Sequence, residues 1–227
     1  MKGVLNQNTA SRKVLADSQK VKFPYAINYR GTRIVVHKKV FSPRHFHGWK
    51  VFNENFPSVH GKKVLEIGTG SGVTALYLAK RGAKRVLAVD ISQYAVKNTK
   101  DNIELNKLKN VEIRRSNIFS AIKKGEQFDM IYWNTPFIYA PSAYKFRSVL
   151  ERGLFDPGYR ITERFLRDGK RYLAPKGCIL FGTGDYGDVP RFKKIAKEHG
   201  YKVRLVAQEK SVEMNPVVFE LYELKPA

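Results

Sequence analysis

The stretch Val64-Leu65-Glu66-Ile67-Gly68-Thr69-Gly70-Ser71-Gly72 constrains the fold more than any other part of the sequence. A short apolar run enters three glycines at alternate positions, and a helical pattern over residues 72–81 follows. Glycine tolerates backbone angles that are closed to other residues and lets a ligand approach the main chain. In open α/β sheets, ligands bind at the carboxyl ends of the strands, where such a loop lies. The sequence therefore predicts a parallel α/β sheet with a binding site at this turn.

Strands and helices are expected to alternate along the rest of the chain. Apolar runs predict strands at residues 63–67, 85–90, 111–115, 128–133, 177–182, 202–208 and 217–223. Helices are expected at residues 72–81, 92–106, 156–172 and 189–199, the third with Asp156 as N-cap and Pro157 at its first position. Strands separated by helices pair in parallel through right-handed crossovers. The expected fold class is α/β, with a mostly parallel seven-stranded sheet and helices on both faces.

The sequence before residue 61 follows a different pattern. Residues 1–22 show no clear periodicity and are expected to form a flexible or weakly helical basic arm. Residues 27–36 predict a β-hairpin, and residues 45–56 predict a helix with aromatic side chains three and four positions apart. We therefore expect an N-terminal part at 1–60, made of arm, hairpin and helix, and a ligand-binding domain at 61–227.

The charge of the chain is strongly basic. Its 227 residues include 42 Lys and Arg against 20 Asp and Glu, which gives a formal net charge of +22. Residues 1–60 hold 11 of these bases and 2 of these acids. Such a balance favours an anionic macromolecular partner, either RNA or a protein associated with nucleic acid. A lysine-rich surface that only keeps the protein soluble is the alternative.

Several classes of protein are excluded or disfavoured. No apolar run approaches the roughly 18–20 residues of a membrane span, and the N-terminus turns polar too soon for a signal peptide. The single cysteine, Cys178, excludes an internal disulfide and is expected to be a small core residue. His45-x-His47 has no third ligand cluster beside it, so no metal site is expected. The expected compartment is the reducing cytoplasm; the sequence does not specify an oligomeric state.

Two acids accompany the glycine loop. Glu66 precedes it, and Asp90 ends the next predicted strand, 22 residues after Gly68. A carboxylate at that place can accept hydrogen bonds from both hydroxyls of a ribose. The dinucleotide pattern G-x-G-x-x-G would need its third glycine at Val73. The loop therefore suits a nucleoside without requiring a pyrophosphate cradle, and a tight turn without a ligand is the alternative.

These features resemble class I S-adenosylmethionine-dependent methyltransferases, which have a Rossmann-like fold. The resemblance implies that the glycine loop holds the amino acid part of S-adenosylmethionine and that Asp90 binds its ribose. It further places Asn117 at the adenine amino group and Ile118 against the adenine ring, although Asn117 could be a simple turn residue. The cofactor-binding residues implied are Glu66, Gly68, Thr69, Gly70, Gly72, Asp90, Ile91, Asn117, Ile118 and Asn134.

The tetrapeptide Asn134-Thr135-Pro136-Phe137 follows the fourth predicted strand. It resembles the N-P-P-Y/F signature of methyltransferases that modify amino or amide nitrogens, which implies that all four residues belong to the catalytic site. The Asn134 side-chain oxygen and the Thr135 carbonyl would accept the two N–H bonds of the target nitrogen, and Phe137 would stack on its planar group. Thr135 stands where the signature has proline, which is expected to loosen the loop.

A further likeness concerns residues 28–223, whose layout is similar to the HemK/PrmC protein-glutamine methyltransferases. Val40-Phe41-Ser42-Pro43-Arg44 resembles the V-x-x-P-R segment that precedes their catalytic domain. Those enzymes carry a helical N-terminal domain, where this chain has about 25 basic residues. Recognition of the substrate is therefore expected from Arg12, Lys13, Lys20 and Lys22 together with residues 138–147. That loop mixes aromatic and basic side chains, which can stack on bases and contact phosphate, or form an ordinary lid over the cofactor.

Three functions follow from these patterns. The first is an S-adenosylmethionine-dependent N-methyltransferase of a macromolecule, acting on a nucleobase of RNA or DNA or on protein glutamine. The second is an N-methyltransferase of a small metabolite or natural product. The third, a non-enzymatic RNA-binding protein that has kept the fold, is disfavoured because Glu66, Asp90 and Asn134 are all present.

Overall fold

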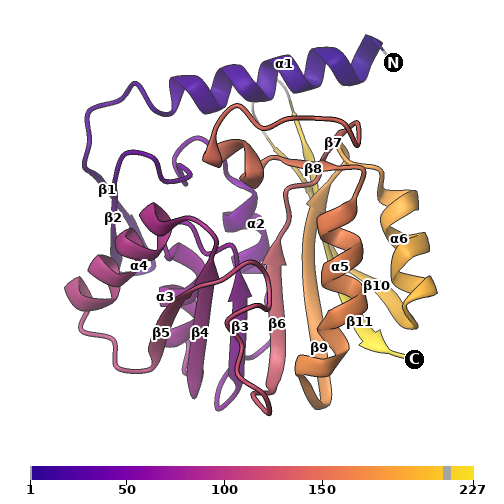
Figure 1. The fold of residues 1–227 in the computed structure, drawn as a ribbon. Helices are drawn as coiled ribbons and strands as arrows, with labels where there is room; N and C mark the ends of the chain where they lie inside the picture. The colour runs from indigo at the N-terminus through magenta and orange to yellow at the C-terminus, as the bar shows by residue number, and fades with distance from the viewer. Residues whose placement is uncertain (1, 212–215) are drawn as a thin grey trace.

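The computed structural model describes residues 2–211 and 216–227. A seven-stranded sheet with the order β10-β11-β9-β6-β3-β4-β5 forms its centre (Figure 1). Its strands, in chain order, are β3 (Lys63–Ile67), β4 (Arg85–Asp90), β5 (Val111–Arg115), β6 (Phe128–Asn134), β9 (Leu173–Gly184), β10 (Tyr201–Lys210) and β11 (Val218–Pro226). All neighbours pair in parallel except β11, which runs antiparallel to both β9 and β10. The predicted fold class is thus confirmed.

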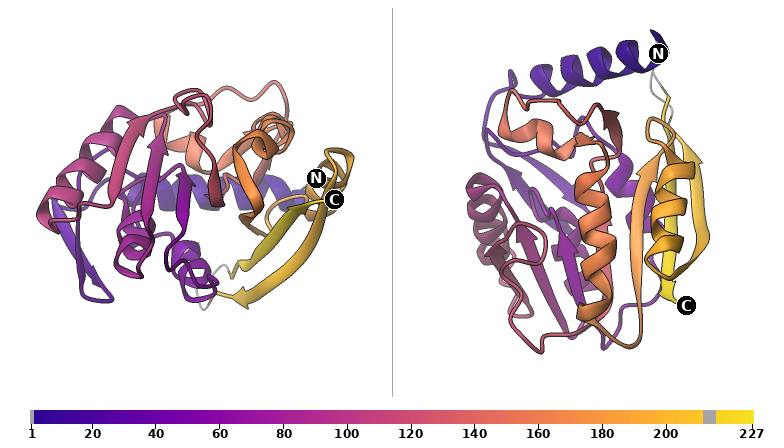
Figure 2. Two further views of the ribbon diagram at one scale, coloured as in Figure 1. Left: turned by 90° about the horizontal axis from the view of Figure 1, so that it is seen from below. Right: turned by 45° about the vertical axis from the view of Figure 1, so that its right-hand side comes forward.

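Helices cover both faces of this sheet (Figure 2). One face carries α2 (Gly48–Glu54), α3 (Val73–Lys80) and α4 (Gln93–Leu105), and the other carries α5 (Arg160–Gly169) and α6 (Val189–Glu198). Neighbouring strand residues alternate between the two layers: Val64 packs in the cluster under α3, and Leu65 packs in the cluster under α5. Burial on both faces explains why the central strands are almost continuously apolar.

The first residues form a helix rather than a flexible arm. Helix α1 (Lys2–Asp17) lies across the top of the molecule in Figure 1. Its Leu15 is 5% exposed and packs with Ile138 and Phe155. Short helices gain most of their stability from such packing rather than from their own sequence. This explains why local periodicity did not predict α1. No helix in the described part of the chain is long and apolar enough to cross a membrane.

The predicted hairpin is present as β1 (Tyr25–Tyr29) and β2 (Thr32–Val36). Two fully buried asparagines one turn apart on α4 bind the free edge of β2. Asn102 accepts the Val35 N–H at 2.9 Å and donates to the Val35 carbonyl at 2.8 Å. Asn98 donates to the same carbonyl at 2.7 Å. Because Asn102 also donates to the Ser71 carbonyl at 2.9 Å, the hairpin is tied directly to the glycine loop.

The helix predicted to begin at Asp156 begins later. Strand β8 (Phe155–Pro157) occupies this position and pairs in parallel with β7 (Ile138–Ala140), a short strand that the sequence pattern did not indicate. Tyr159 adopts a left-handed conformation with φ 59°, and α5 starts after it at Arg160. The Asp156 carboxylate still accepts hydrogen bonds from two amides in the first turn of α5, at 3.0 and 2.8 Å. The acid therefore caps the helix from before the break.

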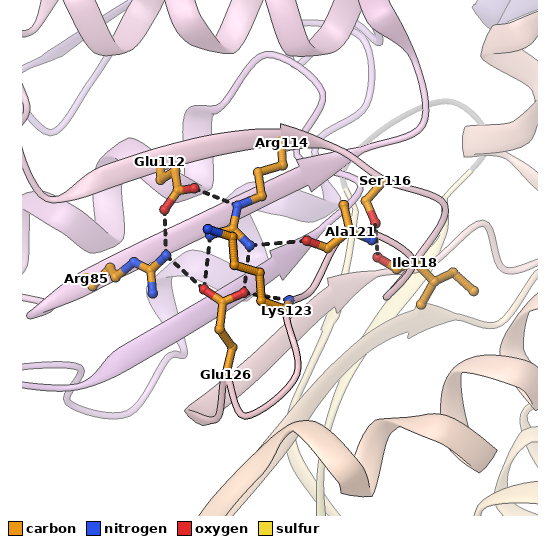
Figure 3. Close-up of polar contacts among 8 residues, drawn as sticks. All are labelled: Arg85, Glu112, Arg114, Ser116, Ile118, Ala121, Lys123 and Glu126. Atoms are coloured by element: carbon orange, nitrogen blue, oxygen red, sulfur yellow. Dashed lines mark hydrogen bonds and ion pairs between the residues drawn. The ribbon is translucent and has the colours of Figure 1, made fainter.

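A cluster of four charged side chains closes the β5 edge of the sheet (Figure 3). Arg114 donates to both oxygens of Glu126, at 2.6 and 3.0 Å, and to Glu112 at 2.6 Å. Arg85 donates to the same two carboxylates, at 2.5 Å to Glu112 and 3.1 Å to Glu126. Arg114 also donates to the Ala121 carbonyl at 3.1 Å. These bonds hold the loop between β5 and β6 against the sheet.

The variant Glu126→Gln tests the stability of this cluster. Hydrogen bonds from Arg114 lower the pKa of Glu126 to about 2 from the ordinary value of 4.5. Its contribution is therefore complete above pH 4.5 and is lost as pH falls toward 2. We expect the variant to lose about 2 kcal/mol of unfolding free energy at about pH 7, and less at about pH 3. Denaturant titration at both pH values measures the two losses.

Glu104→Gln is the matched control, because Glu104 lies in an exposed ion pair with Lys100. Its loss should be within a few tenths of a kcal/mol at either pH. Equal losses for the two variants would contradict the account of the cluster.

Candidate active site

A cavity of about 570 Å³ lies at the carboxyl ends of β3, β4, β5 and β6. It brings together nearly every residue that the sequence predicted for the site. The predicted residues that line it are Glu66, Gly68, Thr69, Gly70, Asp90, Ile91, Asn117, Ile118, Asn134, Thr135, Pro136 and Phe137. Gly72 does not line the cavity and instead lies at the N-cap of α3.

The three loop glycines all have left-handed backbone angles. Their φ values are 68° at Gly68, 59° at Gly70 and 83° at Gly72. A residue with a side chain would cost about 1–2 kcal/mol at each position. At Gly72, a Cβ atom would also stand 2.9 Å from the Thr99 side chain. The glycines are therefore required by the path of the backbone, which turns sharply from β3 into α3.

Asp90 connects this loop to the next strand. Its carboxylate accepts the Gly70 N–H at 3.0 Å and the Ser92 N–H at 2.8 Å, one on each oxygen. Burial raises the pKa of the Asp90 carboxyl, and these two N–H bonds partly offset the rise. Each oxygen keeps acceptor capacity beyond its one backbone bond. The pair of oxygens can therefore accept two neighbouring hydroxyls of a ligand.

Glu66 is a buried acid in the same wall, 4% exposed. It accepts the Thr69 hydroxyl at 2.6 Å. Burial raises the pKa of Glu66 to about 8, although the bonds from Thr69 and from the Ala75 N–H lower it. The side chain is therefore mostly protonated at neutral pH in the free protein.

The turn after β5 carries Asn117 and Ile118. The Asn117 side chain is exposed, and its oxygen accepts a hydrogen bond from Arg164. Ile118 is 6% exposed and has φ 57°, an uncommon conformation for a β-branched residue. Ser116 holds this turn by donating to the Ile118 carbonyl at 2.7 Å and accepting the Ala121 N–H at 3.0 Å (Figure 3). The strain fixes an apolar side chain in the cavity wall.

The tetrapeptide begins at the last residue of β6. The Asn134 side-chain amide makes no hydrogen bond within residues 2–211 and 216–227, and it lines the cavity. Thr135 donates both its N–H, at 3.0 Å, and its hydroxyl, at 2.9 Å, to the Gly182 carbonyl. The expectation that Thr135 loosens the loop is therefore wrong, because proline could make neither bond. The Thr135 carbonyl accepts the Phe137 N–H at 2.9 Å and keeps one lone pair.

The opposite wall of the cavity was not predicted from the sequence. It comes from residues 37–49, from α1 and from the 3₁₀ helix η1 (Val149–Gly153). The residues that form most of it are Ser11, Val14, Phe41, His45, Phe46, Trp49, Leu150 and Arg152. The only signal in the sequence was the density of aromatic and histidine residues directly after Val40.

Helix α1 is fastened over the cavity through Arg12. Its guanidinium donates to the Tyr144 hydroxyl at 3.3 Å, lies 3.7 Å from the Glu151 carboxylate and stands over the Phe155 ring at 5.0 Å. Glu151 is 4% exposed and also accepts the Tyr144 hydroxyl at 2.7 Å and the Arg147 N–H at 2.7 Å. Arg12 therefore joins the basic N-terminus to the loop at 138–147. Both segments cover the cavity.

The other cations predicted for recognition have simpler positions. Lys13 and Lys20 both pair with Asp17 at the surface, at 2.7 and 2.9 Å. His45 shares a hydrogen bond of 2.7 Å with the Ser42 hydroxyl through Nδ1. Cys178 is a free, buried thiol, as expected. Within the part of the chain that the structure describes, no three His, Cys, Asp or Glu side chains gather into a metal site.

An open α/β sheet, a left-handed glycine loop and an acid at the end of the neighbouring strand define a class I S-adenosylmethionine-dependent methyltransferase. The cavity suits this cofactor, because Asp90 offers two acceptor oxygens for ribose hydroxyls and Ile118 offers an apolar surface for a base. The chain belongs to the methyltransferase small domain family, whose sequence profile matches residues 31–210. The protein is thus an enzyme that uses S-adenosylmethionine as its methyl donor.

Known relatives support the same class. A Methanocaldococcus jannaschii protein named "putative protein N5-glutamine methyltransferase" is 31% identical over 81% of this chain and 92% of its own length. A ribosomal protein L11 methyltransferase of Lactobacillus johnsonii is 32% identical over 64% of this chain, but only 39% of its own length is covered. The solved T. thermophilus 16S rRNA N2 G1207 methyltransferase shares the fold, with a TM-score of 0.65 and 18% identity over 90% of this chain and 50% of that one.

The variant Glu66→Gln should change how stability depends on pH in the cofactor-free protein. Because the folded pKa of about 8 exceeds the ordinary 4.5, the stability contributed by protonated Glu66 is complete below pH 4.5 and is lost as pH rises to about 8. Glutamine stays neutral throughout. We therefore expect the variant to gain stability relative to the wild type across this range, with no further gain above it. Denaturant titrations at several pH values measure the difference, and a constant difference would contradict the burial of a neutral acid.

Two variants of Thr135 test how the tetrapeptide is held. Thr135→Val removes the hydroxyl bond to Gly182 and should cost about 1 kcal/mol of unfolding free energy. Thr135→Pro removes the N–H bond as well and should cost more. Thermal unfolding measures both. A proline variant as stable as the wild type would show that these bonds do not fix the loop.

Proposed function

We propose that this enzyme methylates a planar amino or amide nitrogen of a macromolecule, with the side-chain amide of a protein glutamine as acceptor. The observation that carries the proposal is the Asn134 side chain, which lines the cavity with its amide unpaired within the described residues. The Thr135 carbonyl beside it keeps one lone pair. Two neighbouring oxygens are thus available to a nitrogen that bears two hydrogens.

The chemistry of the acceptor explains these residue types. When bound, S-adenosylmethionine supplies an electrophilic methyl group. An amide nitrogen is a weak nucleophile because its lone pair is delocalised into the carbonyl. Hydrogen bonds from its two N–H groups to Asn134 and Thr135 hold the nitrogen in place and favour its pyramidal form. The nitrogen then gains a methyl group and gives up one proton. Phe137 packs edge-on against Phe219, with ring centroids 6.4 Å apart, and offers a face for the planar group.

We assign the cofactor to the half of the cavity formed by the glycine loop. Glu66 and the loop from Gly68 to Gly72 surround its amino acid part, and Asp90 accepts the ribose hydroxyls. Ile91 and Ile118 flank the adenine ring, with Asn117 beside the adenine amino group. Residues 61–227 then form the cofactor-binding part of the chain, and residues 1–60 supply the cover through which the acceptor is recognised.

Protein glutamine is favoured over other acceptors by two observations. The M. jannaschii relative, 92% of whose length is matched, carries a glutamine methyltransferase name. The cavity is also covered by α1 and η1, so that its acceptor side is bounded by apolar and aromatic side chains such as Val14 and Phe41. Such an enclosed apolar space suits the narrow stem of a single side chain. We further place the enzyme in the cytoplasm, where its free Cys178 remains reduced.

A nucleobase is the second candidate acceptor. The net charge of +22 favours an RNA or DNA partner, since phosphate contacts dominate such binding. The amino group of a base is also planar and carries two hydrogens, so Asn134 and Thr135 could bind it in the same way. The enzyme would then be a nucleic-acid-binding methyltransferase, and its binding to substrate would weaken steeply with added salt.

Transfer of a labelled methyl group into a cell extract distinguishes these acceptors. We expect the label to be sensitive to protease, resistant to ribonuclease, and recovered as methylated glutamine after digestion. A label removed by ribonuclease would establish the nucleobase reading instead. A label that passes a small-pore filter would mean a metabolite acceptor and would contradict both.

The variant Asn134→Ala should separate catalysis from cofactor binding. Removing one preorganised hydrogen-bonding group from a reacting centre costs about 100-fold or more in turnover. We expect a loss of this size with labelled cofactor and extract, while calorimetry shows cofactor affinity close to that of the wild type. Asn28→Ala makes the same chemical change at an exposed position of the hairpin and should leave both quantities unaltered. Undiminished turnover in Asn134→Ala would show that the tetrapeptide is not the catalytic centre.

A further inference from the structure

Trp133 holds a buried donor without a partner beside the glycine loop. The residue is 4% exposed, lies between Phe165 and Phe181 with ring centroids 4.7 and 6.0 Å away, and lines the cavity. Its indole N–H donates to no acceptor within residues 2–211 and 216–227. The other tryptophan, Trp49, donates its N–H to the Pro43 carbonyl at 2.9 Å. Buried indole N–H groups ordinarily find such a partner, so the free one at Trp133 points to a ligand.

The nitrogen edge of the Trp133 ring faces Gly68. A Cβ atom built on Gly68 would stand 3.6 Å from the indole nitrogen and 3.9 Å from the adjacent ring carbon. Only a residue without a side chain leaves this space open, and both residues line the cavity. A ligand that follows the glycine loop therefore meets the indole N–H at Gly68.

The loop itself has few donors left for an anionic group. The amides of Gly68 and Thr69 both donate to the Val89 carbonyl, at 2.8 and 3.1 Å. The Gly70 amide donates to Asp90 at 3.0 Å, and the Gly72 amide closes the turn onto the Thr69 carbonyl at 2.9 Å. In many glycine loops such amides bind the anion directly. Here these four are used within the protein, so an anion must find its donor elsewhere.

We propose that Trp133 donates its indole N–H to the α-carboxylate of S-adenosylmethionine and is thereby a cofactor-binding residue. The indole nitrogen is a donor only, so it can pair with the carboxylate of the amino acid end but not with its ammonium group. The neighbouring acids Glu66 and Asp90 cannot bind a carboxylate when ionised, which leaves the ammonium and hydroxyl groups to them. The proposal rests on the assignment of the amino acid part to the glycine loop.

Binding of four ligands to wild type and Trp133→Phe tests this hydrogen bond. S-adenosylmethionine and S-adenosylhomocysteine have the carboxylate, whereas decarboxylated S-adenosylmethionine and methylthioadenosine lack it. A hydrogen bond to a charged group corresponds to roughly 10-fold or more in affinity. Calorimetry should show a loss of this size for the first two ligands in the variant and unchanged affinity for the last two. An equal loss for all four ligands, or no loss for any, would overturn the proposal.

A second measurement does not depend on the folding of the phenylalanine variant. The chain contains two tryptophans, so Trp49→Phe leaves Trp133 as the sole indole fluorophore. S-adenosylhomocysteine should shift the emission of Trp133 more than methylthioadenosine does, because only the former can accept its N–H. Identical shifts with the two ligands would contradict the hydrogen bond. If the wild type bound neither ligand, the cofactor assignment itself would be wrong, which is a different outcome from unequal effects among ligands that bind.

Discussion

The rest of the structure depends on the left-handed turn that connects β3 to α3. Its glycines direct the amides of Gly68 and Thr69 to the Val89 carbonyl and the amide of Gly70 to Asp90, so the turn is built against the neighbouring strand. Asp90 also binds the amide of Ser92, whose hydroxyl caps α4 at Ala95. One carboxylate thus fixes the loop, the end of β4 and the start of the next helix. A ligand held by Asp90 is consequently held by three elements at once.

Helix α4 carries this arrangement outward to the N-terminal part of the chain. Asn102 binds the β2 backbone at Val35 and the glycine loop at Ser71, so the hairpin and the cofactor side of the cavity are joined by a single buried side chain. On the other side, Arg12 and the buried Glu151 hold α1 over the acceptor half. Because both halves of the cavity are bounded by residues from the N-terminal part, cofactor binding and acceptor recognition share one enclosure. This explains how a chain without a large recognition domain can still select its acceptor.

The sequence predicted the centre of the fold better than its cover. Strands β3 and β4 matched their predicted bounds because both are buried on two faces and end in glycine or capping residues. The start of α5 was wrong because Asp-Pro ordinarily begins a helix, whereas here the left-handed Tyr159 delays it. Helix α1 and the aromatic wall at residues 37–49 could not be predicted, since their order comes from contacts distant in sequence. The unpaired N–H of Trp133 is likewise a property of three-dimensional surroundings, which no local pattern of residues indicates.

The central claim is that the cavity transfers a methyl group to a planar nitrogen held at Asn134. The most direct measurement is carbon-13 NMR of the product formed with cofactor labelled at its methyl carbon. The account predicts a methyl carbon bonded to nitrogen, with coupling to nitrogen-15 when the acceptor is grown on that isotope. A methyl carbon bonded to carbon, oxygen or sulfur in the product would contradict the account, whichever molecule carries it.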